Sequence, residues 1–420
     1  MAELLGAPAS PSATAVRRSG AALAVATVVS NLLGYAFAIV LSRSLGPGGY
    51  GALASLLALG LIGSVPAIAL QLLVARETAE APGRSADWVR TSAVLGLTFM
   101  VLVWLTAPFA TAFLELSGPV PVLWLGVTLL PVTVTGALQG VLLGARRYGA
   151  LAASYLLLSG LRLAGAGVAA LLGWSVSGAI GAAAVGTALS AVAVARITTG
   201  GGALPRTRAG RGDGPRQHVR LLVAAASATA AILLLTNLDV VLARHYLPAE
   251  ESGQYGVGAL FAKAAFWAPH FLAVMAFPML VARGGRRRSL LITTGLTLAI
   301  GAVVVLGALL FAGPLLELTV GTAYARGAEL APQFAVLGVL AALLQLLLFA
   351  GLARRTRRAE AFVWSGITVQ VVLVAGWFHG SAEQVLATSI AVCAALVAVI
   401  VADELRPGAA AWRAAAGTRQ

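Results

Sequence analysis

The sequence has few charged residues, a single lysine and a single cysteine. Of its 420 residues, 10% are charged and 59% are hydrophobic. A soluble globular protein carries about 25% charged residues, so this chain cannot cover a water-exposed surface of its size. The lone Cys393 excludes a disulfide within one chain and argues against a metal site built from cysteines. Most of the chain must therefore face lipid or other buried helices.

Motifs of several enzyme classes are also absent. The sequence holds no His-Glu-x-x-His zinc motif, no glycine-rich phosphate loop and no paired cysteines. Without an ATP site, any transport energy would come from an ion gradient, the membrane potential or downstream consumption of the substrate. We therefore expect no enzyme activity, no catalytic residue, no metal site and no cofactor.

Long apolar runs occupy most of the chain. A helix that spans a bilayer needs about 20 apolar residues, and twelve runs come near this length. They predict an all-α polytopic membrane protein. The predicted spans are 20–41, 51–74, 91–114, 119–144, 150–172, 177–195, 221–243, 255–281, 289–312, 331–352, 361–378 and 384–402.

The basic residues are distributed unevenly between alternate connections. One side holds 24 of the 29 basic residues, whereas the opposite connections hold only Arg43, Arg244 and Arg326. The positive-inside rule then places both termini in the cytoplasm. The net charge of +14 is thus a topology signal, and we expect no nucleic-acid partner. The skew toward arginine, alanine and glycine suggests a bacterial gene, and hence the bacterial plasma membrane.

Two stretches about two hundred residues apart resemble each other. One is LSRSLGPGGYGALASLLAL, from Leu41, and the other is LARHYLPAEESGQYGVGALFAKA, from Leu242. They align Arg43 with Arg244, and the Tyr-Gly pair at Tyr50 with that at Tyr255. Each stretch joins the first helix of a six-helix set to the second on the outer side. This pattern predicts two parallel repeats, related by an axis along the membrane normal.

The repeat predicts the organisation of the whole chain. We expect a disordered cytoplasmic tail at 1–19 and an N-terminal six-helix bundle at 20–196. A cytoplasmic linker at 197–219 leads to a C-terminal six-helix bundle at 220–403 and a cytoplasmic tail at 404–420. Two bundles that rock around a central cleft would form a transporter.

Three stretches carry a resemblance to a known family. The stretch from Leu41 resembles the N-terminal signature of the polysaccharide-biosynthesis membrane proteins. These are the oligosaccharide flippases of the multidrug/oligosaccharidyl-lipid/polysaccharide (MOP) superfamily. The stretches LQGVLLGARRYGALAASYLLLSGLRLAGAGVAALLG, from Leu138, and LTNLDVVLARHYLPAEESGQYGVGALFAKA, from Leu235, resemble the family's fourth-to-fifth and seventh-to-eighth helix regions. The last four helices match the family only in layout.

The resemblance implies a fold and a substrate. The fold would be two six-helix bundles around a V-shaped central cavity. The substrate would be an oligosaccharide on a polyprenyl phosphate or pyrophosphate, moved from the inner to the outer leaflet by alternating access. Such transport would serve the biosynthesis of cell-surface polysaccharide.

Three ionisable residues lie deep within predicted spans. Such residues are costly in a membrane, so Arg162, Asp239 and Lys263 are candidate substrate-cavity residues. Arg162 would either pair with the substrate phosphate or hydrogen-bond neighbouring helices. Asp239 and Lys263 would either neutralise each other as a structural pair or exchange partners during transport.

Polar residues within and beside the spans form a second group of candidates. Asn31 and Asn237 are candidate sugar contacts, and Asp239 with His270 could relay protons. Arg43 and Arg244 could bind phosphate or lipid headgroups at the outer mouth, or simply extend toward the interface. Interhelical hydrogen bonds are the alternative role for most polar residues in spans. The remaining polar residues of this group within the spans are Tyr35, Gln71, Gln139, Thr236, Gln345 and Gln370.

Other functions remain open from the sequence. A drug/cation antiporter of the same superfamily is the nearest alternative. A membrane-embedded glycosyltransferase or polymerase would need larger outer loops than these. The loop ARETAEAPGRSADWVR lacks the Gly-x-x-x-Asp-Arg motif expected of a major-facilitator transporter. The expected partners are lipid-linked oligosaccharide, membrane lipids, H⁺ or Na⁺ as coupling ion, and a glycan polymerase or glycosyltransferases.

Overall fold

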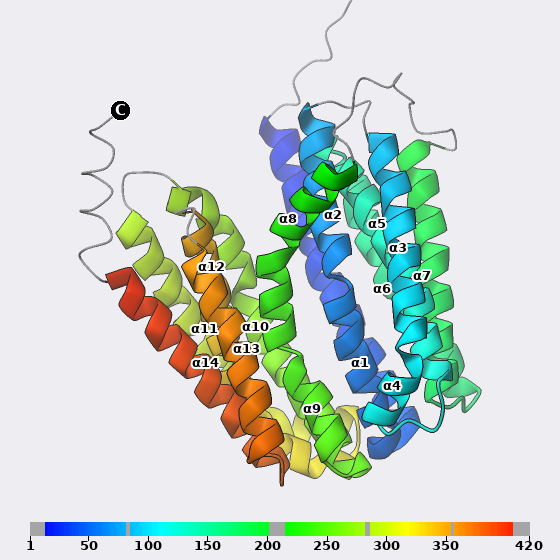
Figure 1. Cartoon of the computed structure of the whole chain (residues 1–420), viewed down its shortest axis with the longest axis vertical. Coiled ribbons are helices and arrows are strands. Elements are labelled where there is room, and N and C mark those ends of the chain that lie inside the picture. Colours follow the sequence, from blue (N-terminus) through cyan, green and yellow to red (C-terminus); the bar gives the residue numbers. More distant parts are fainter. Residues whose placement is uncertain (1–12, 81–84, 201–214, 282–285, 354–356, 406–420) are drawn as a thin grey trace, which may run out of the picture. The chain divides into compact units, whose positions relative to one another are not determined.

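The computed structural model describes residues 13–80, 85–200, 215–281, 286–353 and 357–405. The side chains at 13–21, 85–86, 215–222, 224–225, 270–281, 286–290, 352–353 and 404–405 lie outside this description. Every regular element in the described ranges is helical (Figure 1), which confirms the predicted all-α class. Ten stretches of helix in these ranges are long and apolar enough to cross a membrane.

The helices follow the predicted spans, with two differences in counting. The predicted first and second spans share one continuous stretch of candidate span, Ala22–Glu80. The predicted eighth span lies in α10 (Ala249–Val281), whose later side chains are outside the described residues. These two points account for the difference between the twelve predicted spans and the ten counted.

The chain forms two compact units, each with its own core. The first contains the chain up to Ser44, Gly63–Ala110 and Gly118–Ala226, and the second contains Leu45–Ile62, Thr111–Ser117 and the chain from Ser227 onward. The second unit thus includes two segments that the sequence assigns to the N-terminal bundle. The contiguous bundles at 20–196 and 220–403, and the central cavity, stay predictions. The predicted tails and linker lie largely outside the described residues.

Helix α5 is central to the first unit. It packs against α2, α3 and α7, and α6 packs against α7. Glycines on one face of α5 bring its backbone close to α2, because a Cβ at Gly136 or Gly144 would lie 2.4 Å from a carbonyl oxygen of α2. Small residues at four-residue spacing allow such close packing between membrane helices. The helices from α2 to α7 are α2 (Val65–Glu80), α3 (Ser85–Leu105), α4 (Ala107–Phe113), α5 (Val120–Gly144), α6 (Tyr148–Leu171) and α7 (Val176–Thr199).

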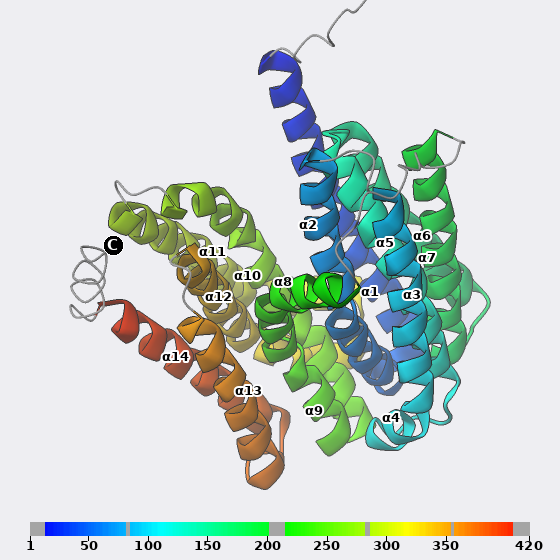
Figure 2. The same cartoon turned by 45° about the horizontal axis from the view of Figure 1, so that its top comes forward.

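Helices α10 and α12 form the core of the second unit. They pack against each other and against α11, while α14 packs against α12 and α13. Figure 2 shows α13 and α14 side by side. The remaining helices are α8 (Pro215–Leu235), which leads into this unit, α9 (Leu238–Tyr246), α11 (Arg286–Thr319), η2 (Thr322–Tyr324), α12 (Ala325–Ala353), α13 (Arg358–Gly376) and α14 (Ala382–Leu405).

The two repeated corners pack against each other within the second unit. Helix α1 (Ala13–Gly63) bends at Gly46, and its last part crosses the start of α10. A Cβ at Gly51 would lie 2.3 Å from Oγ of Ser252, and a Cβ at Gly253 would lie 1.9 Å from the Pro47 carbonyl oxygen. The glycines of both corners are therefore required where the two backbones touch.

Two predicted spans contain a break. The second span is interrupted at Ser64, and Pro66 in the first turn of α2 has no N–H to continue the preceding helix. The seventh span is interrupted at Thr236 and Asn237, between α8 and α9. The second break places Asp239 in the first turn of α9.

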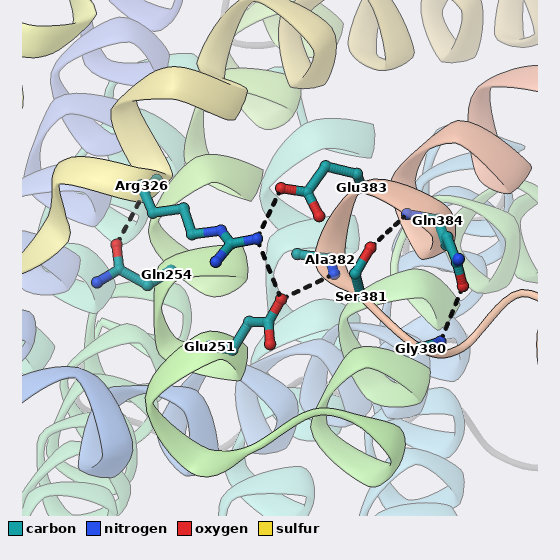
Figure 3. Close-up of polar contacts among 9 residues, drawn as sticks. Glu251, Gln254, Arg326, Gly380, Ser381, Ala382, Glu383 and Gln384 are labelled. Atoms are coloured by element: carbon teal, nitrogen blue, oxygen red, sulfur yellow. Dashed lines mark hydrogen bonds and ion pairs between the residues drawn. The ribbon is translucent and has the colours of Figure 1, made fainter.

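Polar side chains join three helix N-termini of the second unit (Figure 3). Nη2 of Arg326 lies 2.9 Å from Oε1 of Glu383 and 3.9 Å from Oε1 of Glu251. The same Glu251 oxygen accepts a 3.0 Å hydrogen bond from the amide of Ala382. In addition, Oε1 of Gln254 accepts a 3.0 Å hydrogen bond from the Gly327 amide. Because Arg326 and Glu383 are about half exposed, this network holds helix ends together rather than forming a buried site.

Candidate functional site

Arg162 lies on α6 in the first unit with part of its guanidinium group unsatisfied. Its Cζ atom lies 5.2 Å from the centroid of the Phe37 ring, a distance at which a cation is attracted to an aromatic face. Its Nε is buried and has no hydrogen-bond partner among the described residues. A buried N–H without an acceptor is costly, so the group is suited to an acceptor from outside the chain.

A row of hydroxyl and amide groups lies on the same face of α6. Tyr155, Ser159 and Arg162 follow at the spacing of successive helical turns, so they share one face. The hydroxyl of Ser30 on α1 contacts the Ser159 hydroxyl and donates a 3.3 Å hydrogen bond to the Tyr155 carbonyl oxygen. Nε2 of Gln71 donates a 2.9 Å hydrogen bond to the Tyr155 hydroxyl. This face thus combines one cation with groups that can replace water around a polar ligand.

No acidic side chain pairs with Arg162 among the described residues of the first unit, whose acids Glu77, Glu80 and Asp87 lie at the end of α2 and the start of α3. Between Asp87 and Asp213 the sequence contains one carboxylate, Glu115, and this residue belongs to the second unit. On the N-terminal side, residues 4–76 contain none. Ionisable groups within membranes usually pair with one another, and Arg162 has no such partner in the part of the chain that the structure describes. An anionic ligand would supply it.

Asp239 is the buried acid of the second unit. It is 2% exposed, and its Oδ2 accepts a 3.0 Å hydrogen bond from the hydroxyl of Tyr255 on α10. Its Oδ1 is buried and has no partner among the described residues. The amide oxygen Oδ1 of Asn237, at the N-cap of α9, is likewise buried and unpaired. The break before α9 therefore gathers two free acceptor oxygens at a helix N-terminus.

Polar side chains extend from Asp239 to two further helices. The hydroxyl of Tyr255 also interacts electrostatically with Ser389 on α14. Nε2 of Gln370 on α13 donates a 2.9 Å hydrogen bond to Oγ of Ser389. The other end of this amide, Oε1 of Gln370, is a third buried oxygen without a partner in the described chain. Oxygen atoms of carboxylates and amides are the ligands that hard cations prefer.

Lys263 and Asp239 attract each other electrostatically, but no contact ion pair joins them in the described residues. Both residues belong to the second unit, on α10 and α9. Lys263 is partly exposed, whereas Asp239 is buried. The sequence placed them at similar depth but could not give the direction of each side chain. A contact pair that only neutralises charge is therefore not the arrangement of this structure.

The remaining predicted residues have separate environments. Asn31 and Arg43 are exposed, whereas Arg244 is 5% exposed and donates hydrogen bonds to backbone carbonyls. The two arginines of the repeat thus differ, although the sequence treated them alike. His270 lies on α10, and its side chain is outside the described residues.

Sequence reasoning gave too little weight to Tyr255, Gln370 and Ser389. The sequence indicates Tyr255 only as part of the repeat, and Gln370 only as one of several polar residues in the spans. Ser389 carries no sequence signal, because serines are frequent in apolar helices where they bond to their own backbone. In this structure the Ser389 hydroxyl donates to the Val385 carbonyl oxygen of its own helix at 2.9 Å and also accepts the bond from Gln370.

Comparisons with known proteins relate the chain to one group of solved structures. No family model matches the sequence, and no curated protein matches it. A multidrug resistance MATE family transporter of the MOP superfamily, in an inward-facing conformation, superposes with a TM-score of 0.71 at 14% identity. The match covers 88% of this chain and 92% of that chain.

Two further structures agree with this match. A MOP superfamily transporter from Pyrococcus furiosus gives a TM-score of 0.62 at 15% identity, covering 92% of this chain and 93% of that chain. The eukaryotic MATE transporter AtDTX14 gives 0.62 at 14% identity, covering 91% and 93%. The chain therefore has the fold of the MOP superfamily transporters.

Proposed function

We propose that this protein flips a polyprenyl-(pyro)phosphate-linked oligosaccharide from the inner to the outer leaflet of the bacterial plasma membrane. It does so by alternating access, and the product feeds the biosynthesis of cell-surface polysaccharide. Both termini lie in the cytoplasm. A glycan polymerase or glycosyltransferases are the partners that would supply or consume such a substrate.

The uncompensated Arg162 is the observation that carries this proposal. A phosphate headgroup must lose water to cross the membrane, and a preorganised guanidinium offsets that loss through charge-assisted hydrogen bonds. The row of Ser30, Tyr155 and Ser159 beside it offers hydroxyl groups to sugar hydroxyls. The P. furiosus neighbour is described as having a binding pocket of reverse polarity that suggests a different function. Pocket polarity is thus a property that can separate functions within this fold.

The Asp239 network supports coupling to a monovalent cation or a proton. Its free carboxylate oxygen and the free amide oxygens of Asn237 and Gln370 could ligate Na⁺, and the carboxylate alone could accept H⁺. Either ion would stabilise a buried acid that otherwise has one oxygen unsatisfied. Binding at this network would then bias the second unit toward one conformation of the cycle.

A drug/cation antiporter is the second candidate. The buried Asp239 favours it, because an organic cation needs an acidic partner, and the structural neighbours include a multidrug resistance transporter. The two candidates differ in the charge of the ligand and in the residue that binds it. Arg162 would bind the ligand in the flippase, and Asp239 would bind it in the antiporter.

A binding experiment separates the two candidates. The purified protein in lipid nanodiscs is heated with polyprenyl phosphate, with the uncharged polyprenol, or with the cationic dye ethidium. The proposal predicts that polyprenyl phosphate alone raises the melting temperature, and that Arg162→Ala abolishes the shift while Arg196→Ala keeps it. A shift with ethidium that depends on Asp239, together with none from polyprenyl phosphate, would establish the antiporter instead.

A further inference from the structure

A short segment of the first half of the chain is held by the second unit. This strap, Thr111–Ser117, connects α4 to α5 and belongs to the second unit, unlike the residues on either side of it. Arg244 of α9 donates from Nε to the Leu114 carbonyl oxygen at 2.9 Å and from Nη2 to the Glu115 carbonyl oxygen at 3.0 Å. Its third bond runs from Nη1 to Oγ of Ser252 at 3.2 Å.

The next residue of α9 holds the strap a second time. Nδ1 of His245 lies 2.8 Å from the Phe113 carbonyl oxygen, and this nitrogen carries the proton because a carbonyl only accepts. The two rings stack with centroids 4.0 Å apart and planes 7° from parallel. Two consecutive side chains of α9 thus hold three consecutive carbonyl oxygens of the strap, those of residues 113–115.

The strap contact adjoins the crossing of the two repeated corners. Ser252, which receives the third bond of Arg244, is also the residue whose hydroxyl faces Gly51 of the first corner. Tyr50 of that corner is fully buried and meets Tyr324 edge-on at 6.3 Å. The Arg244 side chain therefore bonds to the strap and to Ser252, the residue of α10 that packs against the first corner.

The chemistry of the contact suits repeated opening and closing. Arg244 bonds to two carbonyls and a hydroxyl, and the exposed carboxylate of Glu115 attracts it without an ion pair in the described chain. When such a contact opens, water can satisfy both sides, and no anion is left stranded. Glu115 holds a positive φ of 49°, a backbone state that is costly for a residue with a side chain. This backbone state closes the end of α4, because the Leu116 amide donates to the Thr111 carbonyl oxygen at 3.0 Å.

We propose that Arg244 and His245 form a latch that captures the strap and keeps the outer corners closed until substrate release. The latch rests on the proposed transport function, since release to the outer side requires the outer connections to separate. It is one-sided: Arg43, the counterpart of Arg244 in the repeat, is exposed and has no partner in the described residues. Substitution of Arg43 is therefore a matched control for substitution of Arg244.

Thiol accessibility tests the latch without any substrate. Ser252→Cys places a thiol reporter at the crossing, where Ser252 is 3% exposed, and each variant is compared with Ser252→Cys alone, which keeps the two bonds from Arg244 to the strap carbonyls. Native Cys393, 2% exposed in α14, reports unfolding in the same molecule. The protein in nanodiscs is labelled with a polar maleimide, and each cysteine is quantified by mass spectrometry. We expect Arg244→Gln to raise the labelling rate at position 252 at least fivefold while Cys393 stays unlabelled.

Two further variants complete the test. Arg43→Gln should leave the labelling rate at position 252 unchanged, and His245→Leu should raise it by a smaller factor than Arg244→Gln. The latch is refuted if Arg244→Gln leaves the labelling rate at position 252 unchanged. It is also refuted if position 252 and Cys393 become reactive together, because this would show that Arg244 only stabilises the fold. Since no substrate is present, a failure of the proposed lipid transport would leave a positive labelling result standing.

Discussion

The hydroxyl of Tyr255 donates a 3.0 Å hydrogen bond to one carboxylate oxygen of Asp239, while the other oxygen is buried without a partner. This arrangement predicts cation-dependent stability. Na⁺ should raise the melting temperature of the protein in nanodiscs relative to an equal concentration of choline, because it satisfies the free oxygen. Asp239→Asn should remove this difference.

The equivalent tyrosines of the two corners provide a matched pair for that experiment. Tyr255→Phe should lower stability by about 1–3 kcal/mol, since it leaves a buried acceptor unpaired, and should weaken the response to Na⁺. Tyr50→Phe should leave the response unchanged, because Tyr50 meets an aromatic ring and not the acid. An identical sodium response in wild type and Asp239→Asn would exclude this network as the cation site.

Asp239 and Lys263 attract each other without a contact ion pair in the described residues, which predicts a weaker energetic coupling than a contact pair would give. Breaking a buried contact pair costs roughly 3–5 kcal/mol in soluble proteins. Without an ion pair, a double-mutant cycle on stability with Asp239→Asn and Lys263→Met should give a coupling energy below about 1 kcal/mol. We expect the double variant to fold but not to transport. Restored transport in the double variant would show that the two charges only neutralise each other.

The glycine crossing predicts a position-specific loss of stability. Gly253→Ala should lower the melting temperature strongly, because its Cβ would lie 1.9 Å from the Pro47 carbonyl oxygen, which is backbone and cannot move away alone. Gly48→Ala is the control, since its Cβ would lie 3.6 Å from that of Ala249, an ordinary contact. Equal melting temperatures for the two variants would mean that the corners do not pack as the structure has them.

The arginine distribution predicts the orientation of the chain. Gly149 and Ala249 are both exposed at helix starts, and nothing lies within 4 Å of a Cβ at Gly149. In intact cells, a cysteine at position 249 should react with an impermeant thiol reagent added outside, and one at position 149 should react only after permeabilisation. The reverse result would invert the topology.

Much of the fold was predictable, because span length and loop charge are properties of composition. Apolar runs gave the order of the helices but not all of their ends, since the span predicted at 331–352 is observed at Thr322–Gly351. The break in the helix before Asp239 was not predictable, since its two residues, Thr236 and Asn237, are neither proline nor glycine. The capture of Thr111–Ser117 by α9 was also hidden, because Arg244 bonds to backbone carbonyls, which have no sequence signature.

The candidate site was predictable in its residues but not in its connections. Arg162, Asp239 and Lys263 are conspicuous because charges are rare in spans. Their partners depend on how each helix is rotated about its axis, and a residue's position along a predicted span does not give this rotation. The path from Asp239 through Tyr255 to Ser389 and Gln370 joins four helices and required the tertiary structure.

Flipping of a fluorescent polyprenyl-pyrophosphate-linked oligosaccharide in proteoliposomes tests the central claim most directly. Wild type should move the lipid between leaflets, and Arg162→Ala should reduce the rate at least tenfold with an unchanged melting temperature. Arg162→Lys should retain part of the rate, because it keeps the charge but loses the planar fork of donors, and Arg196→Ala should behave as wild type. Full activity of Arg162→Ala, or no flipping by a folded wild-type protein, would contradict the account.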